Sequence, residues 1–144
     1  MRTIYPVIFT ESEGNILIEV PDLGILSETN EEGKSKGTMA DAIATARDAI
    51  GIHCISKEDC GQTLPIPSDM MTLDASKGTF ADEGKSIISL VDVDLVEYRR
   101  KIDNRSVRRN VTLPNWLNIE AEKAHINVSK VLQDALMTTL GVSK

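Results

Sequence analysis

Three polar side chains that can read DNA bases occupy alternate positions near the C-terminus: Arg108, Asn110 and Thr112. Arginine can donate two hydrogen bonds to guanine, asparagine can form a matching pair with adenine, and threonine can hydrogen-bond a base or touch the thymine methyl. Alternate residues of a β-strand share one face. The opposite face of this stretch holds Val107, Arg109, Val111 and Leu113. The spacing predicts a strand with one base-reading face, in which the Arg109 head reaches solvent from the frayed end of the ribbon. A register shifted by one residue would instead invert the two faces.

A second polar pair, Ser129 and Lys130, follows Asn127, which is a good helix N-cap. The N–H groups of a first helical turn favour anions, so this pair is suited to bind a DNA backbone phosphate. Two other interpretations remain open. The polar strand face could simply be solvated in a plain dimerisation module, or the helix from Val128 could be the recognition helix of a helix-turn-helix. The long apolar stripe on that helix leaves little polar surface for a groove.

The carboxylates Asp92 and Asp94 would lie on one side of a strand, where they could share a metal ion. Hydrolysis with two metal ions needs several convergent carboxylates with open coordination positions. Asp94 is explained more simply as the N-cap of a following helix. The other acids considered are expected on separate elements: Glu19, Asp22 and Asp41. The sequence therefore predicts neither an enzyme nor a metal site.

His53 and Cys54 lie on the apolar stripe of a predicted helix, close to Cys60. A zinc site needs about four such ligands, so buried structural roles are favoured for His53 and Cys54. Two cysteines make no disulfide framework, and we expect reduced thiols in a cytoplasmic protein. The N-terminus has no secretory signal pattern, and no apolar run approaches the roughly 20 residues that a membrane span needs.

The N-terminal part of the chain predicts a small sheet covered by one helix. Thr38 followed by Asp41 is typical of a helix start, and the apolar spacing after it predicts about four turns or more. Because Pro6 lacks an N–H, we expect the first strand at a sheet edge or with a bulge. The stretch from Gly61 to Gly84 predicts an irregular connection. The expected order is β-β-β-α-β, with strands at Ile4–Phe9, Ile16–Val20, Ile25–Thr29 and Ile87–Val91 and a short helix from Asp94 to Ile102.

The residues from Ser106 onward predict a strand and two helices within fewer than forty residues, closed by Gly141 as a C-cap. A unit of this size can hardly bury its own apolar faces, and a lone strand leaves its N–H and C=O groups unpaired. Both difficulties disappear if two chains pair these strands antiparallel and interlock four helices in a shared core. Such a ribbon fits the major groove of B-DNA.

The net charge of −6 hides a division between the two parts of the chain. Met1 to Glu97 carries 7 Lys and Arg against 18 Asp and Glu, a balance of −11. Tyr98 to Lys144 carries 9 against 4, a balance of +5. Charge asymmetry of this kind favours two partners of opposite sign, a basic protein for the first part and a polyanion such as DNA for the second.

The stretch VRRNVTLPNWLNIEAEKAHINVSKVLQDALMTTLG resembles the Arc/MetJ-type ribbon-helix-helix module at the C-terminus of HicB-type antitoxins. The N-terminal segments YPVIF, IEVPDL, TMADAIATARDAI, LPIPS and IISLVDVDLVEY are similar to the HicB domain itself. The resemblance implies a partial RNase-H-like β-β-β-α-β fold that blocks HicA, a small basic mRNA-cleaving toxin. It also implies repression of the operon's own promoter, with base reading by Arg108, Asn110 and Thr112. The segment PDLGIL and the loop 30–37 depart from the family pattern.

Together these observations predict an α+β protein with two domains, residues 1–102 for toxin binding and 103–144 for DNA binding. The predicted function is that of an antitoxin that binds a HicA-like toxin directly and autorepresses its operon through operator DNA. We expect a cytoplasmic homodimer without cofactors, and association into tetramers stays open. The alternative is a stand-alone ribbon-helix-helix repressor with an N-terminal ligand-sensing domain. The toxin-contact residues expected near strand ends and the long loop are Glu19, Asp22, Glu28, Glu31 and Glu32.

Overall fold

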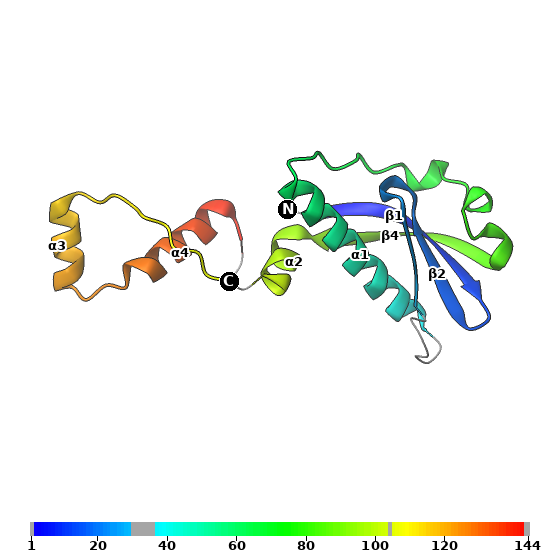
Figure 1. Cartoon of the computed structure of the whole chain (residues 1–144), viewed down its shortest axis with the longest axis horizontal. Helices are drawn as coiled ribbons and strands as arrows, with labels where there is room; N and C mark the ends of the chain where they lie inside the picture. The colour runs from blue at the N-terminus through cyan, green and yellow to red at the C-terminus, as the bar shows by residue number, and fades with distance from the viewer. Residues whose placement is uncertain (1, 30–36, 104, 143–144) are drawn as a thin grey trace. The chain divides into compact units, whose positions relative to one another are not determined.

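The computed structural model describes residues 2–29, 37–103 and 105–142. By its internal contacts the chain divides into two units, Met1–Asp103 and Asn104–Lys144. The first unit contains the strands and two helices, and the second contains two further helices (Figure 1). The elements of the first unit are β1 (Arg2–Ser12), β2 (Asn15–Val20), β3 (Ile25–Glu28), α1 (Met39–Asp59), β4 (Lys85–Asp94) and α2 (Leu95–Ile102). Those of the second unit are α3 (Asn115–Lys123) and α4 (Val128–Leu140).

The four strands form one antiparallel sheet in the order β3-β2-β1-β4. A two-residue turn at Glu13 and Gly14 joins β1 to β2, and the φ angles of these residues are 50° and 81°. Positive φ at both central residues is typical of tight hairpins, because such turns match the twist of the strands. The predicted hairpin and the order β-β-β-α-β are confirmed.

The strand β1 lies inside the sheet, so the prediction that Pro6 puts this strand at an edge is wrong. Pro6 lies opposite Leu90 of β4 in a continuous register without a bulge. On the other side, the pairing of β1 with β2 begins only at Ile8, opposite Glu19. Pro6 is tolerated in a central strand because β2 has already ended beside it, so the missing N–H removes no hydrogen bond from the sheet.

The helix α1 begins at a capping box, as predicted from Thr38 and Asp41. The Thr38 hydroxyl accepts a hydrogen bond from the Asp41 N–H at 3.2 Å, and the Asp41 carboxylate accepts one from the Thr38 N–H at 3.0 Å. These bonds satisfy donors that a helix start would otherwise leave unpaired. Ala42 and Ala46 follow on the inner face and are fully buried, which lets the helix lie close to the strands.

The core of the first unit lies between α1 and one face of the sheet (Figure 1). It is mainly aliphatic, in line with the low aromatic content of 3%. The buried cluster comprises Tyr5, Val7, Phe9, Ile16, Ile18, Val20, Leu23, Ala42, Ala46, Ile50, Cys54, Ile55, Val91, Val93 and Leu95. One layer of helix on one face of a sheet therefore supplies the rigid support for this unit.

The helix α2 packs on α1 through Gly51 and Tyr98. A Cβ atom at Gly51 would lie 2.9 Å from the Tyr98 ring, so the absence of a side chain there is what lets the ring approach. The helix continues through Gly51 to Asp59. Arg99 of α2 adds a hydrogen bond of 2.9 Å from Nη1 to the Asp59 carboxylate.

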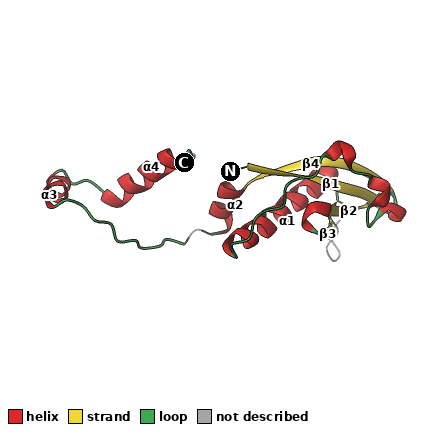
Figure 2. Cartoon of the chain, turned by 90° about the horizontal axis from the view of Figure 1, so that it is seen from above, coloured by secondary structure: helices red, strands yellow, loops and turns green. Residues whose placement is uncertain are grey.

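Residues 60–84 connect α1 to β4 and form an irregular segment, as predicted; we call it the α1–β4 connection. Its short 3₁₀ helices are Met70–Thr72, Ala75–Lys77 and Ala81–Glu83. They lie towards the end of the sheet remote from the N-terminus (Figure 2). The Tyr5 hydroxyl donates a hydrogen bond of 2.7 Å to the Pro65 carbonyl, which fastens the start of the connection to the sheet. Within the described ranges, no helix combines the length and the apolar character needed to cross a membrane.

Candidate DNA and partner interfaces

The segment that carries Arg108, Asn110 and Thr112 forms no strand within the chain. Residues 105–114 are all exposed and contain neither helix nor strand. The three side chains remain close together in sequence on one exposed segment, next to Val107, which is 88% exposed. A strand needs a neighbouring strand for its N–H and C=O groups, and the described residues of the second unit include no strand. The predicted ribbon therefore stays a prediction.

The helix α4 begins and ends as predicted. The Asn127 side chain accepts a hydrogen bond of 3.1 Å from the Lys130 N–H, and Gly141 ends the helix with a left-handed φ of 70°. The bond to Asn127 occupies the N–H of Lys130, so this donor is not available to a phosphate. The predicted phosphate site therefore relies on the Ser129 hydroxyl and the Lys130 ammonium, which are both exposed.

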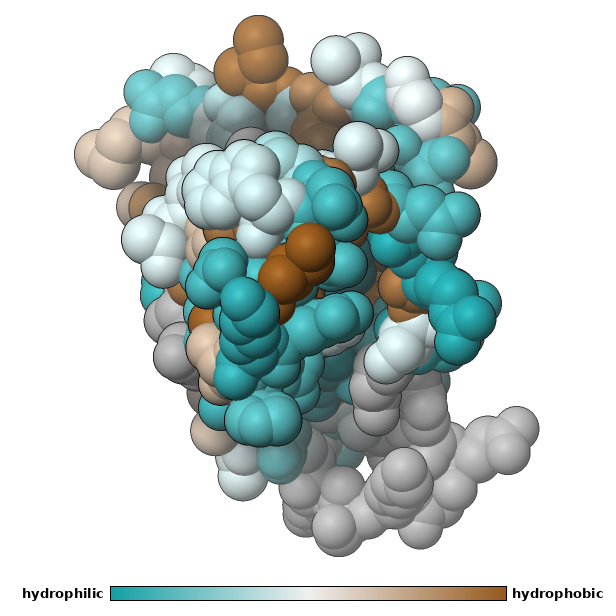
Figure 3. All heavy atoms as spheres, turned by 90° about the vertical axis from the view of Figure 1, so that its left-hand side faces the viewer, coloured by the Kyte–Doolittle hydropathy of each residue, from teal (hydrophilic) through white to brown (hydrophobic). Residues whose placement is uncertain are grey.

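The second unit has no buried side chain among its described residues, 105–142. The apolar residues predicted to face inward are exposed instead; Val131 is 55% and Leu136 is 52% exposed. Figure 3 shows brown apolar side chains at the surface among teal hydrophilic ones. The large apolar residues exposed in this unit are Val107, Val111, Leu113, Trp116, Leu117, Ile119, Ile126, Val128, Val131, Leu132, Leu136 and Leu140. Such a unit gains only part of the stability that full apolar burial would give, because none of these side chains is removed completely from water.

Three predicted toxin-contact acids have hydrogen-bond partners inside the first unit. Asp22 accepts a hydrogen bond of 2.8 Å from the Ser68 N–H and one of 2.5 Å from the Ser68 hydroxyl. Glu19 accepts a bond of 2.8 Å from the Thr79 N–H. These two acids fasten the α1–β4 connection to the sheet, a role that the sequence did not reveal because their partners lie far along the chain. Glu28 accepts a bond of 2.8 Å from Asn15 Nδ2.

The remaining two predicted toxin-contact acids, Glu31 and Glu32, lie outside the described residues. The structure therefore places only three of the five acids, and each of these three has a hydrogen-bond partner within the first unit. Intramolecular hydrogen bonds do not prevent a carboxylate from accepting further bonds at its other lone pairs. The toxin contacts of all five acids stay predictions.

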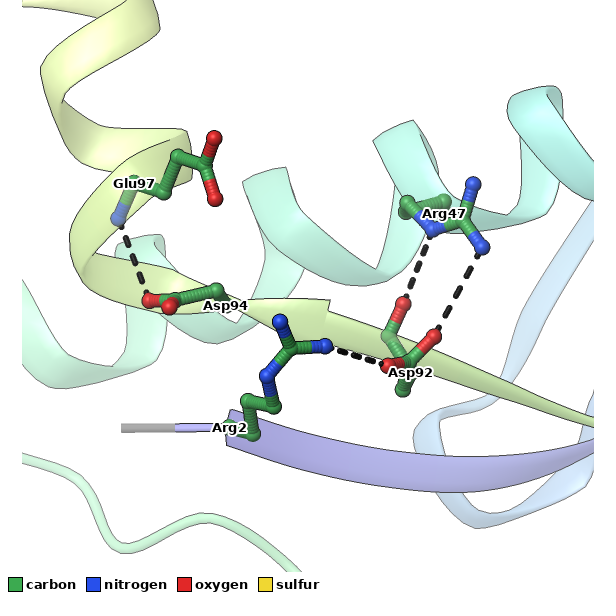
Figure 4. A network of polar contacts seen from close by, with 5 residues as sticks. All are labelled: Arg2, Arg47, Asp92, Asp94 and Glu97. Atoms are coloured by element: carbon green, nitrogen blue, oxygen red, sulfur yellow. Dashed lines mark hydrogen bonds and ion pairs between the residues drawn. The ribbon is translucent and has the colours of Figure 1, made fainter.

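The paired acids at the end of β4 have structural partners (Figure 4). Asp92 is bound by Arg2 at 2.8 Å and lies 3.6 Å from Arg47. Asp94 caps α2, as predicted, by accepting hydrogen bonds from the N–H groups of Glu97 and Val96. The bond from the Glu97 N–H is the main cause that lowers the pKa of Asp94. Two cations and a helix start thus account for both carboxylates, and the described ranges contain no group of three or more metal-ligating side chains.

Three side chains near the end of α1 are of types that can bind zinc: His53, Cys54 and Cys60. Cys54 is fully buried, and this burial raises the pKa of its thiol. Cys60 is exposed at the C-cap of α1, and neither cysteine forms a disulfide. Burial lowers the pKa of His53, whose Nε2 atom has no partner among the described residues. A half-buried imidazole beside the core fits the predicted structural role better than a ligand role.

The chain resembles known proteins both in sequence and in fold. Residues 5–135 match the family described as "HicB_like antitoxin of bacterial toxin-antitoxin system". A chain of a toxin-antitoxin complex from Streptococcus pneumoniae is similar over 96% of this chain and 99% of that chain, at 23% sequence identity and a TM-score of 0.58. The antitoxin HicB of Burkholderia pseudomallei gives 23% identity, 96% and 98% coverage and a TM-score of 0.49. No curated protein matches the chain.

The two kinds of similarity support different conclusions. The likeness to the Streptococcus pneumoniae chain shows a shared fold, an α+β arrangement with an antiparallel sheet and four α-helices. The family match spans most of the sequence and includes both units. This chain therefore belongs to the HicB-like antitoxin family of bacterial toxin–antitoxin systems.

Proposed function

We propose that this antitoxin neutralises a small basic HicA-like toxin by direct contact through its acidic first unit and represses its own operon through its second unit. Two copies of the second unit pair as a ribbon-helix-helix dimer, and Arg108, Asn110 and Thr112 from each copy read operator bases in the major groove. Ser129 and Lys130 hold the flanking phosphates. The protein acts in the cytoplasm, where its operon and the mRNA targets of the toxin are found.

The observation that carries this proposal is the exposure of the whole apolar stripe of the second unit. An apolar face is stable only when another surface removes it from water. In α4 the stripe includes Val131, Leu132 and Leu136, which are 55%, 37% and 52% exposed. Residues 106–113 are exposed and belong to no helix or strand of the described chain. A second copy supplies both missing surfaces at once, because an antiparallel strand pair is related by the same two-fold axis as the four helices.

The opposite charges of the two parts of the chain support separate roles for them, toxin binding and DNA binding. The acidic balance of −11 up to Glu97 attracts a basic protein, and the balance of +5 from Tyr98 onward attracts DNA. Within the described first unit, the α1–β4 connection carries exposed Asp69, Asp74, Asp82 and Glu83 against one basic residue, Lys77. A partner that cleaves RNA must itself have a cationic surface for the phosphates, so an acidic surface can cover it.

Co-expression tests the proposal directly. The chain is produced with the protein of the adjacent reading frame, and the two are purified through a tag on the toxin. We expect a stable complex, normal growth only when both are expressed, and retardation of a DNA fragment that carries the operon promoter. The variant Leu132→Asp puts a charge on the exposed stripe of α4. It should abolish DNA retardation and keep the complex with the toxin, because the first unit has its own core.

The same experiment distinguishes the antitoxin from the alternative function, a repressor that senses a ligand. A ligand-sensing repressor would purify without a protein partner, and its DNA affinity would change on addition of a small molecule. A complex that forms but never binds promoter DNA would remove the repressor half of the proposal. Loss of toxin binding in Leu132→Asp would contradict the assignment of the two tasks to separate units.

A further inference from the structure

The positive charge of the C-terminal part of the chain is concentrated in one short run, residues 99–109, which we call the basic segment. It holds six of the nine Lys and Arg residues that follow Glu97, against a single acid, Asp103. From Asn110 to Lys144, three basic residues are balanced by three acidic ones. The helices α3 and α4 therefore lie in a stretch without net charge, and the whole balance of +5 belongs to the basic segment.

The last turn of α2 supplies three of these residues: Arg99, Arg100 and Lys101. The last turns of α1 and α3 contain one basic residue each, and that of α4 contains none. Cations near the C-terminus of a helix are favoured by the helix dipole. The dipole gives no reason for the remaining three, which lie within residues 105–114, where the chain contains no helix. A helix end therefore explains only half of the basic segment.

Arg99 differs from the other basic residues of the segment because it has two acidic partners at the end of α1. Its Nη1 atom lies 2.9 Å from the Asp59 carboxylate, and its Nη2 atom lies 3.5 Å from that of Glu58. Arg99 thus holds α2 on α1 and offsets two acids that would repel a phosphate. Arg100 and Lys101, next along the chain, are exposed. Exposed ion pairs contribute little to stability, so exposed cations can exchange a protein partner for a phosphate.

Arg109 falls on the face of the predicted strand that holds Val107, Val111 and Leu113. A charged group is costly inside the shared core of a ribbon dimer unless it is paired. The long arginine side chain allows the guanidinium to leave an apolar surface and reach a polar group beyond it. Arginine also matches the geometry of a phosphate with two parallel hydrogen bonds. Phosphate binding therefore gives Arg109 a role that base reading does not.

We propose that the four exposed basic residues of the segment other than Arg108 form a phosphate clamp on the DNA that flanks the ribbon: Arg100, Lys101, Arg105 and Arg109. This inference rests on the proposed DNA binding and extends the contact from the ribbon to the end of α2. Phosphate contacts fix the position of a protein on the duplex but carry no sequence information. The clamp therefore supplies affinity for any duplex, and the three residues of the ribbon face supply the choice of operator.

The length of the chain limits how far along the duplex the clamp reaches. Lys101 and Arg108 are seven positions apart, and an extended chain covers about 3.5 Å per residue, so their Cα atoms lie within about 25 Å of each other. Phosphates of one strand follow each other every 3.4 Å or so along the axis, so this reach corresponds to about seven base pairs. Because the two strands of the ribbon are antiparallel, the two basic segments leave it at opposite ends. The clamp thus extends the contact on both sides of the operator.

The salt dependence of DNA binding by the full chain tests the clamp. The double variant Lys101→Ala with Arg105→Ala removes four phosphate contacts from a dimer. The slope of the logarithm of the binding constant against the logarithm of salt concentration should therefore fall by about 3–4 in magnitude. The loss of affinity should be the same for promoter DNA and for a random duplex. Unchanged toxin capture by the double variant shows that its first unit is intact.

Two further variants serve as controls. Lys101→Arg with Arg105→Lys keeps both charges and should bind DNA with the slope of the wild type. Lys123→Ala removes the basic residue in the last turn of α3, whose side chain is 69% exposed and lies outside the basic segment. It should leave the slope unchanged.

The length of the DNA gives a second measurement of the same contact. A duplex cut back to the base pairs that the ribbon covers lacks the flanking phosphates. Wild type and the double variant should bind this short duplex equally. Flanks of about ten base pairs on each side should restore the advantage of the wild type, since they exceed the reach of the clamp.

The outcomes separate this proposal from the proposed function. Failure of the wild type to bind any promoter fragment contradicts both. A wild type that binds the promoter and a double variant with the same slope overturn the clamp and leave the ribbon assignment intact. The clamp is also wrong if Lys123→Ala lowers the slope as much per removed charge, because the charge then acts on the chain as a whole. An advantage of the wild type that persists on the short duplex places the contacts within the ribbon site and overturns the flanking clamp.

Discussion

Arg47 Nε donates a hydrogen bond of 2.9 Å to the Asp92 carbonyl, and Arg47 Nη2 lies 3.6 Å from the Asp92 carboxylate. One arginine of α1 thus holds both the backbone and the side chain at the end of β4, while Arg2 binds the same carboxylate from β1 at 2.8 Å. The contact joins the covering helix to two strands. Asp92, which the sequence alone suggests as a possible metal ligand, here links the covering helix to the sheet.

Replacement of Asp92 by asparagine should have a small effect on stability and none on any activity. The carboxylate is 42% exposed, so its two ion pairs together should contribute less than about 1 kcal/mol. We expect Tm to fall by no more than about 2–4 °C, measured by circular dichroism. Asp82→Asn, at an exposed acid of the α1–β4 connection, is the matched control. Metal-dependent cleavage of RNA by the wild type that disappears in Asp92→Asn would show that Asp92 is catalytic.

Substitutions on the proposed ribbon face should weaken operator binding in a sequence-dependent way. We expect Arg108→Ala and Asn110→Ala to cost about 1–3 kcal/mol each, because each removes a bidentate base contact. The loss should be largest for the natural operator and small for random DNA, measured by fluorescence anisotropy at fixed salt. Asn118→Ala on α3 is the matched asparagine control. Normal binding by both ribbon variants would show that this face does not read bases.

Lys130→Ala should act differently because its ammonium is proposed to bind a phosphate. Loss of a phosphate contact weakens binding to all sequences about equally and lowers the salt dependence by about one counterion per site. The measurement is the slope of the logarithm of the binding constant against the logarithm of salt concentration. An unchanged slope would place Lys130 away from the DNA backbone.

The sequence predicted the local elements of this chain well where periodicity and capping residues agree. The hairpin, the capping box at Thr38, the Asp94 cap and the Asn127 cap all depend on residues close in sequence, so short patterns suffice to find them. The position of β1 was not predictable from Pro6 alone. That position depends on where β2 stops beside it, which is a property of the whole sheet.

The candidate interfaces were harder to predict because their contacts join distant residues or different chains. Asp22 bonds to Ser68 and Glu19 to Thr79, and no local pattern indicates these pairs. Two of the acids chosen for their charge thus hold the fold together. The stretch from Ser106 to Leu113 has the alternation of a strand but forms no strand within the described chain, so the predicted ribbon stays a prediction.

Replacement of Gly51 by alanine should destabilise the first unit. Alanine favours a helix over glycine by about 0.5–1 kcal/mol, but its Cβ would lie 2.9 Å from the Tyr98 ring, and overpacking of this kind costs about 1–3 kcal/mol. We expect the free energy of unfolding, measured with urea, to fall by about 1 kcal/mol. The double variant Gly51→Ala with Tyr98→Leu should recover part of it, since a smaller side chain leaves room for the Cβ. A more stable Gly51→Ala protein would mean that α2 moves away without cost.

Acid should destabilise the first unit partly through its helix caps. The hydrogen bond with the Thr38 N–H is the main cause that lowers the pKa of Asp41, and the bond from the Glu97 N–H does the same for Asp94. Because both folded-state pKa values lie below the unfolded value of about 4, this stability is complete only about one pH unit above that value and is lost as the pH falls through the folded values. The urea midpoint should therefore decline between about pH 5 and pH 3. Asparagine is also a good N-cap but does not titrate, so Asp94→Asn should show a shallower decline. An identical decline in wild type and Asp94→Asn would mean that other carboxylates control the acid response.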